Sequence, residues 1–244
     1  MVTKAVNKHL ICCIQVCLKI PHLSANTFAL GMKHLYIISG LGADERVFHK
    51  VDFTGYRVAF ISWIKPAPKE SLKQYASRLS KQIIESRPII IGISFGGMLA
   101  VEIAQLLPVE KVILLATAKT RSELPFYYRL AGRLKLHTLL PASVLKQPNF
   151  LSYWLFGVAC EEDRKLLAVI LKETDSAFLK WAMDAIIKWQ NNLIPAASIH
   201  IHGDADHVLP IRFVNPDIRI DGGGHLITLT KAAQLSAALR EMLG

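Results

Sequence analysis

The segment from Pro88 to Gly97 joins an apolar run to a Gly-x-Ser-x-Gly sequence. Its three consecutive isoleucines predict a strand that is buried on both faces, and the residues after Gly96 predict a helix. A serine between such a strand and helix is forced toward a positive φ, so the residues two before and two after it must be small. Gly92 and Gly96 meet this requirement. Ser94 is therefore a candidate nucleophile, placed at the positive end of the helix dipole.

After Met32 the chain alternates short apolar runs with helical patterns. This alternation is typical of a parallel sheet with crossover helices, and it predicts an α/β fold with a mostly parallel central sheet and helices on both faces. A capping box at Ser71 and Gln74 opens one of the helices. The expected strands cover residues 34–39, 56–63, 89–91, 111–117, 198–203 and 217–222, and a closing helix covers residues 231–243.

Length and charge limit the classes of partner. A chain of 244 residues can form one large domain with a substantial core. The sequence is 52% hydrophobic but has no apolar run near the roughly 18 residues that a membrane span needs, so we expect no membrane span. The net charge of +10 comes from scattered basic residues, which argues against a nucleic-acid partner. A small-molecule substrate is the expected partner.

Residues 1–31 differ from the rest of the chain. They contain three lysines, no acidic residue and three of the four cysteines. Because Met32 begins directly on the first expected strand, we interpret Met32 as the true start and residues 1–31 as an extraneous upstream segment. The alternative is a targeting segment, although its apolar part at residues 10–18 is short and lacks a convincing cleavage site. A chain that starts at Met32 keeps Cys160 alone, which fits a reducing, cytoplasmic location.

Residues 120–192 interrupt this alternation of strands and helices. We assign the flanking residues 32–119 and 193–244 to the core. The interruption is helical by pattern and holds 10 of the 20 aromatic residues of the chain. An insertion at this point would lie over the carboxyl ends of the strands, where α/β sheets bind ligands. We therefore predict a helical cap over residues 120–192. Most of its aromatic side chains should form the core of the cap, and a few should line an apolar pocket.

Two late loops supply partners for Ser94. A serine needs a histidine to take its proton, and a carboxylate to hold the tautomer of that histidine. His225 follows three glycines at the end of the last expected strand. Asp206 follows the strand before it, whereas nearby Asp204 is expected to bond to the turn backbone. The resulting order of serine, aspartate and histidine is that of one fold in particular.

On these three motifs the chain resembles the α/β-hydrolases, from about Lys33 to its C-terminus. The resemblance implies an oxyanion hole made by the backbone N–H of Phe95 and by a second N–H in an early loop, here that of Leu41. Ser39 stands where the family usually has histidine, a departure that leaves the backbone donors intact. The first hairpin of larger members is missing, so we expect a shorter sheet.

The resemblance implies a serine esterase or thioesterase that acts on a small, largely apolar acyl substrate through an acyl-enzyme, with no cofactor and no metal. Two alternatives stay open because the fold does not fix the reaction. One is a lyase or C–C bond-cleaving enzyme for an anionic metabolite, and the other is a ligand-binding sensor on the same fold. The lyase alternative would use cationic residues at the start of the cap, which are Arg121, Arg129, Arg133 and Lys135.

The segment from His200 to His207 is superficially similar to the His-x-His-x-Asp-His run of metallo-β-lactamase-like hydrolases. The spacing differs by two residues. His200 would also lie within a strand that is buried on both faces. We therefore predict a satisfied core histidine there rather than a metal ligand.

Overall fold

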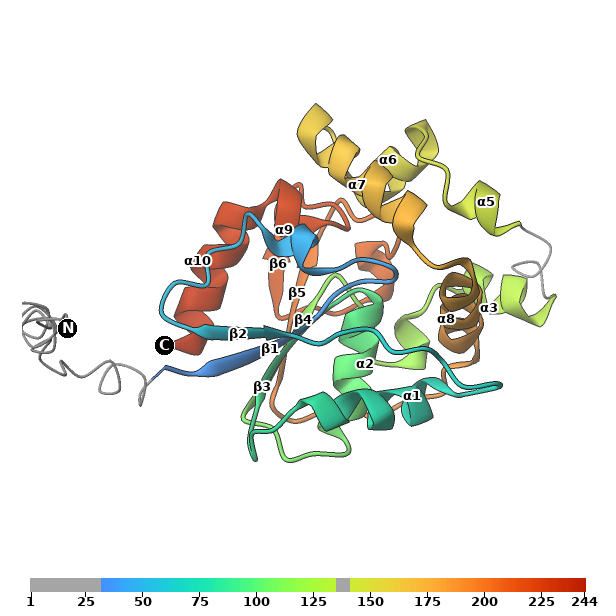
Figure 1. Cartoon of the computed structure of the whole chain (residues 1–244). Coiled ribbons are helices and arrows are strands. Elements are labelled where there is room, and N and C mark those ends of the chain that lie inside the picture. The colour runs from blue at the N-terminus through green and yellow to red at the C-terminus, as the bar shows by residue number, and fades with distance from the viewer. Residues whose placement is uncertain (1–31, 135–140) are drawn as a thin grey trace, which may run out of the picture. The chain divides into compact units, whose positions relative to one another are not determined.

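The computed structural model describes residues 32–134 and 141–244, and Figure 1 shows its helices and strands. Within these residues six strands form one sheet in the order β2-β1-β3-β4-β5-β6, and every neighbouring pair is parallel. The predicted α/β fold with a mostly parallel central sheet is therefore confirmed. The strands are β1 (His34–Ile38), β2 (Arg57–Phe60), β3 (Ile89–Ile93), β4 (Lys111–Leu115), β5 (Ser198–Gly203) and β6 (Ile218–Ile220).

Two segments of the chain, residues 1–31 and 135–140, lie outside the described residues. The interpretation of residues 1–31 as an upstream or targeting segment falls there, and so does Lys135. For the described ranges, no helix has the length and apolar character needed to cross a membrane.

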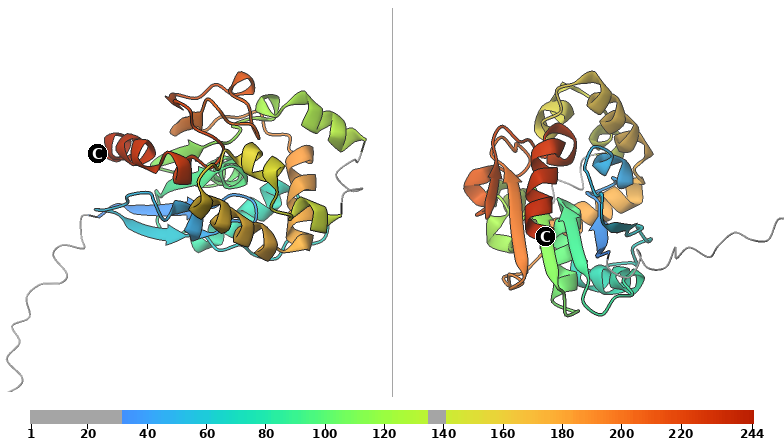
Figure 2. Two further views of the ribbon diagram at one scale, coloured as in Figure 1. Left: turned by 90° about the horizontal axis from the view of Figure 1, so that it is seen from above. Right: turned by 90° about the vertical axis from the view of Figure 1, so that its left-hand side faces the viewer.

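Two apolar cores lie on opposite faces of the sheet, because alternate side chains of each strand point to opposite sides. On one face Leu35 and Ile37 of β1 belong to the core that includes α9 and α10. On the other face Tyr36 and Ile38 belong to the core that includes α1 and α2. Figure 1 and Figure 2 show these helices on the two sides of the sheet. They are α1 (Leu72–Leu79), α2 (Phe95–Ala104), α9 (Ile227–Thr230) and α10 (Ala232–Leu243).

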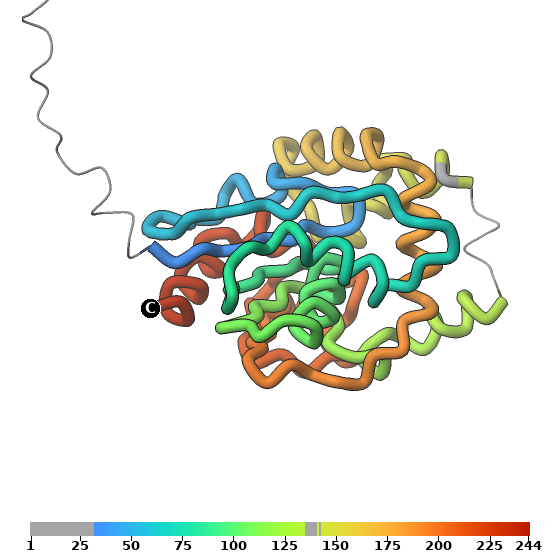
Figure 3. The backbone as a smooth tube through the Cα atoms, turned by 60° about the horizontal axis from the view of Figure 1, so that its bottom comes forward, coloured from blue at the N-terminus to red at the C-terminus, as the bar shows by residue number. Residues whose placement is uncertain are grey.

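The helices between β4 and β5 lie beyond the carboxyl ends of the strands (Figure 1), and their backbone can be followed in Figure 3. The division of the chain into a core of residues 32–119 and 193–244 and a cap of residues 120–192 stays a prediction. Helices in this insertion are η3 (Arg121–Glu123), α3 (Phe126–Arg133), α5 (Ala142–Leu145), α6 (Phe150–Phe156), α7 (Glu161–Glu173) and α8 (Ser176–Lys188).

Local signals set several element boundaries. The predicted capping box is present, because the Ser71 and Gln74 side chains each accept a hydrogen bond from the backbone N–H of the other residue. β2 and β6 are shorter than predicted because each is an edge strand with one neighbour, and each ends where that pairing ends. Outside the insertion, the described residues also form three short 3-10 helices, which are η1 (Glu45–Phe48), η2 (Ser80–Gln82) and η4 (Ile211–Phe213).

Candidate active site

Ser94 lies between β3 and α2 with φ 54° and ψ −121°. A non-glycine residue at such a positive φ costs about 1–3 kcal/mol and persists where its surroundings fix it. Here the backbone N–H of Ser94 donates to the carbonyl of Leu115 (2.9 Å), and its own carbonyl accepts from the Thr117 hydroxyl (2.6 Å). Both contacts come from the end of β4. The neighbouring strand therefore holds the strained turn.

The glycines on either side of Ser94 are required by close backbone approach. A Cβ atom on Gly92 would lie 2.4 Å from the carbonyl oxygen of Gly96, and one on Gly96 would lie 2.2 Å from that of Ser39. Real Cβ atoms do not approach backbone so closely. The prediction that these two positions must be small is therefore confirmed.

The structure brings Ser94, His225 and Asp206 together. The Ser94 Oγ atom lies 2.8 Å from His225 Nε2, and His225 Nδ1 lies 2.7 Å from Asp206 Oδ2. An ionised carboxylate can only accept, so His225 Nδ1 carries a hydrogen and Nε2 is left to accept from the serine hydroxyl. His225 and Asp206 are each 3% exposed, whereas Ser94 is partly accessible. This arrangement can remove a proton from Ser94 while the serine stays within reach of a ligand.

The turn that carries His225 is packed against the end of α6. Gly157 ends this helix with φ 71°, and a Cβ atom on Gly224 would lie 2.7 Å from the Gly157 Cα atom. The backbone N–H of Leu226 also donates to the carbonyl of Phe156 (3.2 Å). These contacts tie the backbone on both sides of His225 to one helix of the insertion.

Asp206 and Asp204 have different surroundings. Oδ1 of Asp206 accepts from the backbone N–H groups of Val208 and Leu209, at 2.8 Å each. Asp204 is exposed, and its side chain accepts from the backbone N–H of Gly222 (2.7 Å), as expected of a turn residue. The structure thus places Asp206, and not Asp204, against the histidine.

Asp206 is held as a carboxylate. Burial alone would raise the pKa of its carboxyl, but the charge and hydrogen bond of His225, together with His202 and the Leu209 N–H, keep that pKa below its usual value. At neutral pH the ionised Asp206 fixes the hydrogen on Nδ1 of His225.

Phe95 and Leu41, the two residues expected to form an oxyanion hole, both lie beside Ser94. Phe95 is the first residue of α2, and Leu41 lines both cavities that contain Ser94. A Cβ atom on Gly40 would be 3.6 Å from the Ser94 Cβ, so the Leu41 loop passes directly alongside the serine. The assignment of the Phe95 and Leu41 backbone N–H groups to an oxyanion hole stays a prediction.

Two cavities meet at Ser94, with volumes of about 420 Å³ and about 250 Å³. Met183 and Ile186 of α8 line both, so this helix spans the space above the serine. A ligand whose reactive carbon sits at Ser94 can thus extend in two directions. The residues that line both cavities are Leu41, Ser94, Phe95, Met183, Ile186, Val208 and His225.

The first cavity has mostly apolar walls. Its main polar groups besides the serine and the histidine are hydroxyls, and that of Tyr128 is already bonded to the carbonyl of Val208 (2.6 Å). Burial raises the pKa of Tyr128 to about 12, so this phenol stays neutral. The residues that line this cavity and not the other are Met98, Ala116, Thr117, Ala118, Leu124, Tyr128, Ala131, Ile187 and Leu209.

The second cavity is also largely apolar, and Lys146 is the one lysine or arginine among its described lining residues. It extends toward η1 and α7. The residues that line it and not the first cavity are Gly40, Ala43, Val47, Ile93, Leu145, Lys146, Phe156, Leu167, Ile170, Leu171, Thr174, Leu179 and Leu226.

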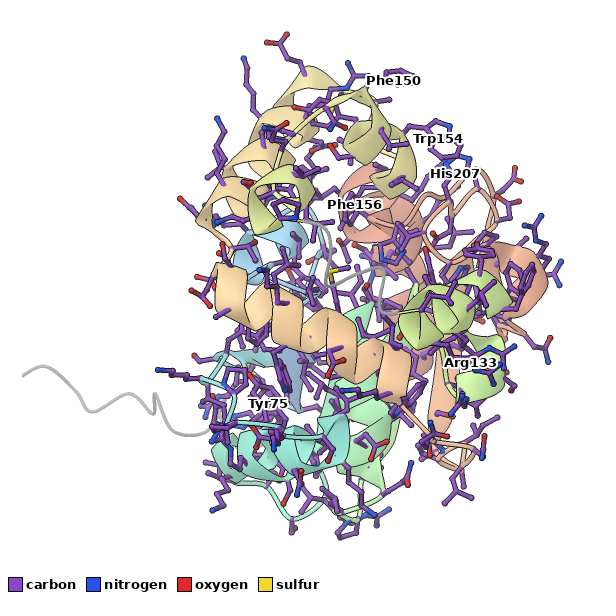
Figure 4. The ribbon with its side chains drawn as sticks, turned by 90° about the vertical axis from the view of Figure 1, so that its right-hand side faces the viewer. Tyr75, Arg133, Phe150, Trp154, Phe156 and His207 are labelled. Atoms are coloured by element: carbon purple, nitrogen blue, oxygen red, sulfur yellow. The ribbon has the colours of Figure 1, made fainter. Side chains whose placement is uncertain are left out.

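The aromatic residues of the insertion contribute less to these walls than their number suggests. Tyr128 lines the first cavity and Phe156 the second, while aliphatic side chains form most of the remaining surface. Phe178 instead packs in the core beside α1 and α2. Figure 4 shows Phe150 and Trp154 on α6, where they are 80% and 47% exposed.

The cationic residues considered for an anionic substrate lie elsewhere. Arg121, Arg129 and Arg133 line neither cavity, and Figure 4 labels Arg133 on α3. Lys135 is outside the described residues. Of the four residues, none that the structure describes is in position to bind a charge next to Ser94.

The histidines of β5 lie deep in the fold. His200 and His202 are both fully buried, as expected for His200. In the part of the chain that the structure describes, no cluster of three or more His, Cys, Asp or Glu side chains could hold a metal ion. The expectation that His200 is fully satisfied is wrong at one atom, because its Nδ1 has no hydrogen-bond partner. Sequence reasoning also missed that His202 contacts Asp206.

Comparisons with known proteins agree with this architecture. The uncharacterised protein family UPF0227 matches residues 44–137, and no curated protein matches the chain. An esterase from Thermogutta terrifontis superposes with a TM-score of 0.66 at 16% identity, over 86% of this chain and 89% of that one. A lipase-esterase related protein from Clostridium acetobutylicum gives 0.65 at 15% identity, over 86% and 93%. An enol-lactonase from Burkholderia xenovorans gives 0.57 at 17% identity, over 87% and 91%.

These likenesses cover nearly all of the described sequence and share one topology. The chain has the α/β-hydrolase fold, as its three motifs predicted. At such low identities the likeness extends to the fold and not to a substrate.

Proposed function

We propose that this protein is a serine hydrolase that cleaves a carboxylic ester or thioester through an acyl-enzyme. The observation that carries the proposal is the continuous hydrogen-bonded series from Ser94 Oγ through His225 to Asp206, at 2.8 Å and 2.7 Å, at the junction of two apolar cavities. The esterase and lipase names of proteins with the same fold support the general class.

The geometry suits a two-step acyl transfer. Ser94 Oγ bonds to the substrate carbonyl carbon while His225 Nε2 takes the serine proton. The backbone N–H groups of Phe95 and Leu41 stabilise the oxyanion of the tetrahedral intermediate. His225 then passes the proton to the departing alcohol or thiol as its bond to the carbonyl carbon breaks. A water molecule, deprotonated by the same histidine, releases the acid and restores Ser94.

The proposed substrate is small and largely apolar. Groups on the substrate would contact aliphatic walls in both cavities. Among the described residues that line these cavities, the one lysine is Lys146. A strongly charged metabolite would have to leave water for walls that are otherwise aliphatic, with Lys146 as the one described cation beside them, which is costly. We therefore favour simple esters and thioesters over the anionic substrates of a lyase.

A fluorophosphonate probe tests the nucleophile. It should label the wild-type protein at Ser94, and S94A should lose both the label and the turnover of p-nitrophenyl acetate. Equal labelling of S94A would refute the assignment. A protein that binds small apolar esters without labelling or turnover would instead be a sensor on this fold.

A matched ester series tests the substrate class. Neutral acetate to octanoate esters should be hydrolysed faster than esters of the same length that carry a terminal carboxylate. A preference for the carboxylate-bearing esters would favour the anionic-substrate alternative.

A further inference from the structure

We propose that His202 is a positioning residue of this site, which holds Asp206 and its loop in the arrangement that serves His225. The inference rests on the proposed function, because it assigns a fourth residue to the same reaction. His202 is fully buried in β5. Its Nε2 atom lies 2.8 Å from the carbonyl oxygen of Leu209 and 3.3 Å from Oδ2 of Asp206.

The hydrogen-bond partners define the tautomer of His202. A backbone carbonyl can only accept, so Nε2 of His202 carries a hydrogen, which it donates to Leu209. Burial lowers the pKa of His202, so the ring is neutral and its Nδ1 is a bare acceptor. Nδ1 lies 3.3 Å from Nε2 of His200, which must then be the donor.

The neighbouring histidine agrees with this direction of donation. With its hydrogen on Nε2, neutral His200 has a bare Nδ1, and that atom has no partner. Burial lowers the pKa of His200 to about 3, with further contributions from His202 and Lys119. The reverse arrangement would leave a buried N–H without an acceptor, which costs more than a bare ring nitrogen. His200 therefore donates to His202, and His202 donates to Leu209.

His202 fixes both ends of one short loop. Leu209 donates its N–H to Oδ1 of Asp206, while its carbonyl accepts from His202. Oδ2 of Asp206 accepts from Nδ1 of His225 and lies 3.3 Å from Nε2 of His202. His202 thus touches the carboxylate and holds the end of its loop. Without His202, Asp206 would lose this polar contact and the loop would lose its anchor on β5.

The other titratable group near Asp206 does not compete with this role. Besides the two histidines, the described group that interacts with Asp206 is the phenol of Tyr128, which stays neutral because burial raises its pKa to about 12. Lys119 interacts with His200 instead.

The test compares H202M, H202Q and H200M with the wild-type protein. Methionine removes the donor, glutamine keeps an N–H near the position of Nε2, and H200M alters an equally buried histidine on the same strand face that does not touch Asp206. Thermal unfolding is measured for each. The kinetic readouts are kcat and KM with a p-nitrophenyl ester.

H202M should lose about tenfold in kcat with little change in KM, because the loop that carries Asp206 loses one hydrogen bond to β5. H202Q should recover most of the loss, and H200M should keep kcat within a few-fold of wild type even if it lowers the Tm. An unchanged kcat in a folded H202M, or H202Q as impaired as H202M, would overturn the inference.

A second readout uses the wild-type protein and needs neither activity nor a folded variant. The ¹⁵N chemical shifts of His202 should report a neutral ring with its hydrogen on Nε2 at pH 7 to 8. A charged ring, or a hydrogen on Nδ1, would refute the role of His202. Failure of the proposed function has a different outcome, since Ser94 would then resist the fluorophosphonate probe whatever the state of His202.

Discussion

Replacing Asp206 with asparagine should inactivate the protein by reversing the tautomer of His225. Oδ1 of Asp206 is fixed by two backbone donors, Val208 and Leu209, at 2.8 Å. The carbonyl oxygen of the new amide must take that position, so its NH₂ group must take the position of Oδ2. Nδ1 of His225 would then face a donor and would have to give up its hydrogen. The hydrogen on Nε2 would point at Ser94, which could no longer transfer its proton.

The expected magnitude follows from the loss of that tautomer. In a serine protease triad the same substitution lowers kcat by about 10⁴, which corresponds to about 5 kcal/mol in the barrier. The fold should be affected less. The new NH₂ group would also face the Nε2–H of His202, which keeps its acceptor on Leu209, so one buried amide hydrogen would lack an acceptor at a cost of about 1–3 kcal/mol. We therefore expect D206N to fold with a lowered Tm and to be almost inactive.

The chain supplies a matched control in D204N. Asp204 is exposed, and an asparagine carbonyl could keep the hydrogen bond from Gly222. D204N should therefore stay within a few-fold of wild type in kcat/KM and within about 0.5 kcal/mol in stability. The assay is p-nitrophenyl ester hydrolysis together with the fluorophosphonate labelling rate and urea unfolding. A D206N variant within tenfold of wild type, or a D204N variant that is equally inactive, would refute this reasoning.

Three further predictions concern stability. G96A should unfold or lose at least 3 kcal/mol, since its Cβ would lie 2.2 Å from a carbonyl oxygen of Ser39; urea unfolding that is unchanged would contradict this. The lowered pKa of Asp206 means that its ionised form favours the folded state above the unfolded pKa of about 3.9, so that contribution should be lost as the pH falls below 4. Unfolding free energies from pH 3 to 6 should show a steeper fall in wild type than in D206N. W189F should cost about 1–3 kcal/mol, because buried Glu102 loses the indole donor at 2.7 Å, and a W189F midpoint equal to that of wild type would exclude the effect.

The elbow could be predicted from sequence because its constraint is local. The contacts that forbid a side chain at Gly92 and Gly96 lie within the turn and in the neighbouring strand, and any chain that places a serine there faces the same collision. The alternation of strands and helices similarly defined the parallel sheet. Asp206 could be distinguished from Asp204 in the sequence because the first carboxylate after the strand is expected to bond to the turn backbone.

The walls of the site could not be predicted in the same way. Whether Met183 or Phe178 faces the serine depends on how α8 is rotated and tilted, which is decided by packing across the sheet. The sequence likewise did not show that Arg121 and Arg133 would line neither cavity. The pattern of β5 placed His200 and His202 on one face, but nothing in it showed that Asp206 would return to that face four residues later.

The contact between Gly157 and Gly224 joins two parts of the molecule that would otherwise vary independently. Helix α6 carries a cavity wall, Phe156, and the turn beyond Gly224 carries His225. Since backbone meets backbone at this point, neither residue can gain a side chain without displacing the other. Exchange of the insertion for that of another protein, as a way to change the substrate range, would therefore have to carry this glycine across with it. A graft without this glycine would displace His225 together with the cavity wall at Phe156.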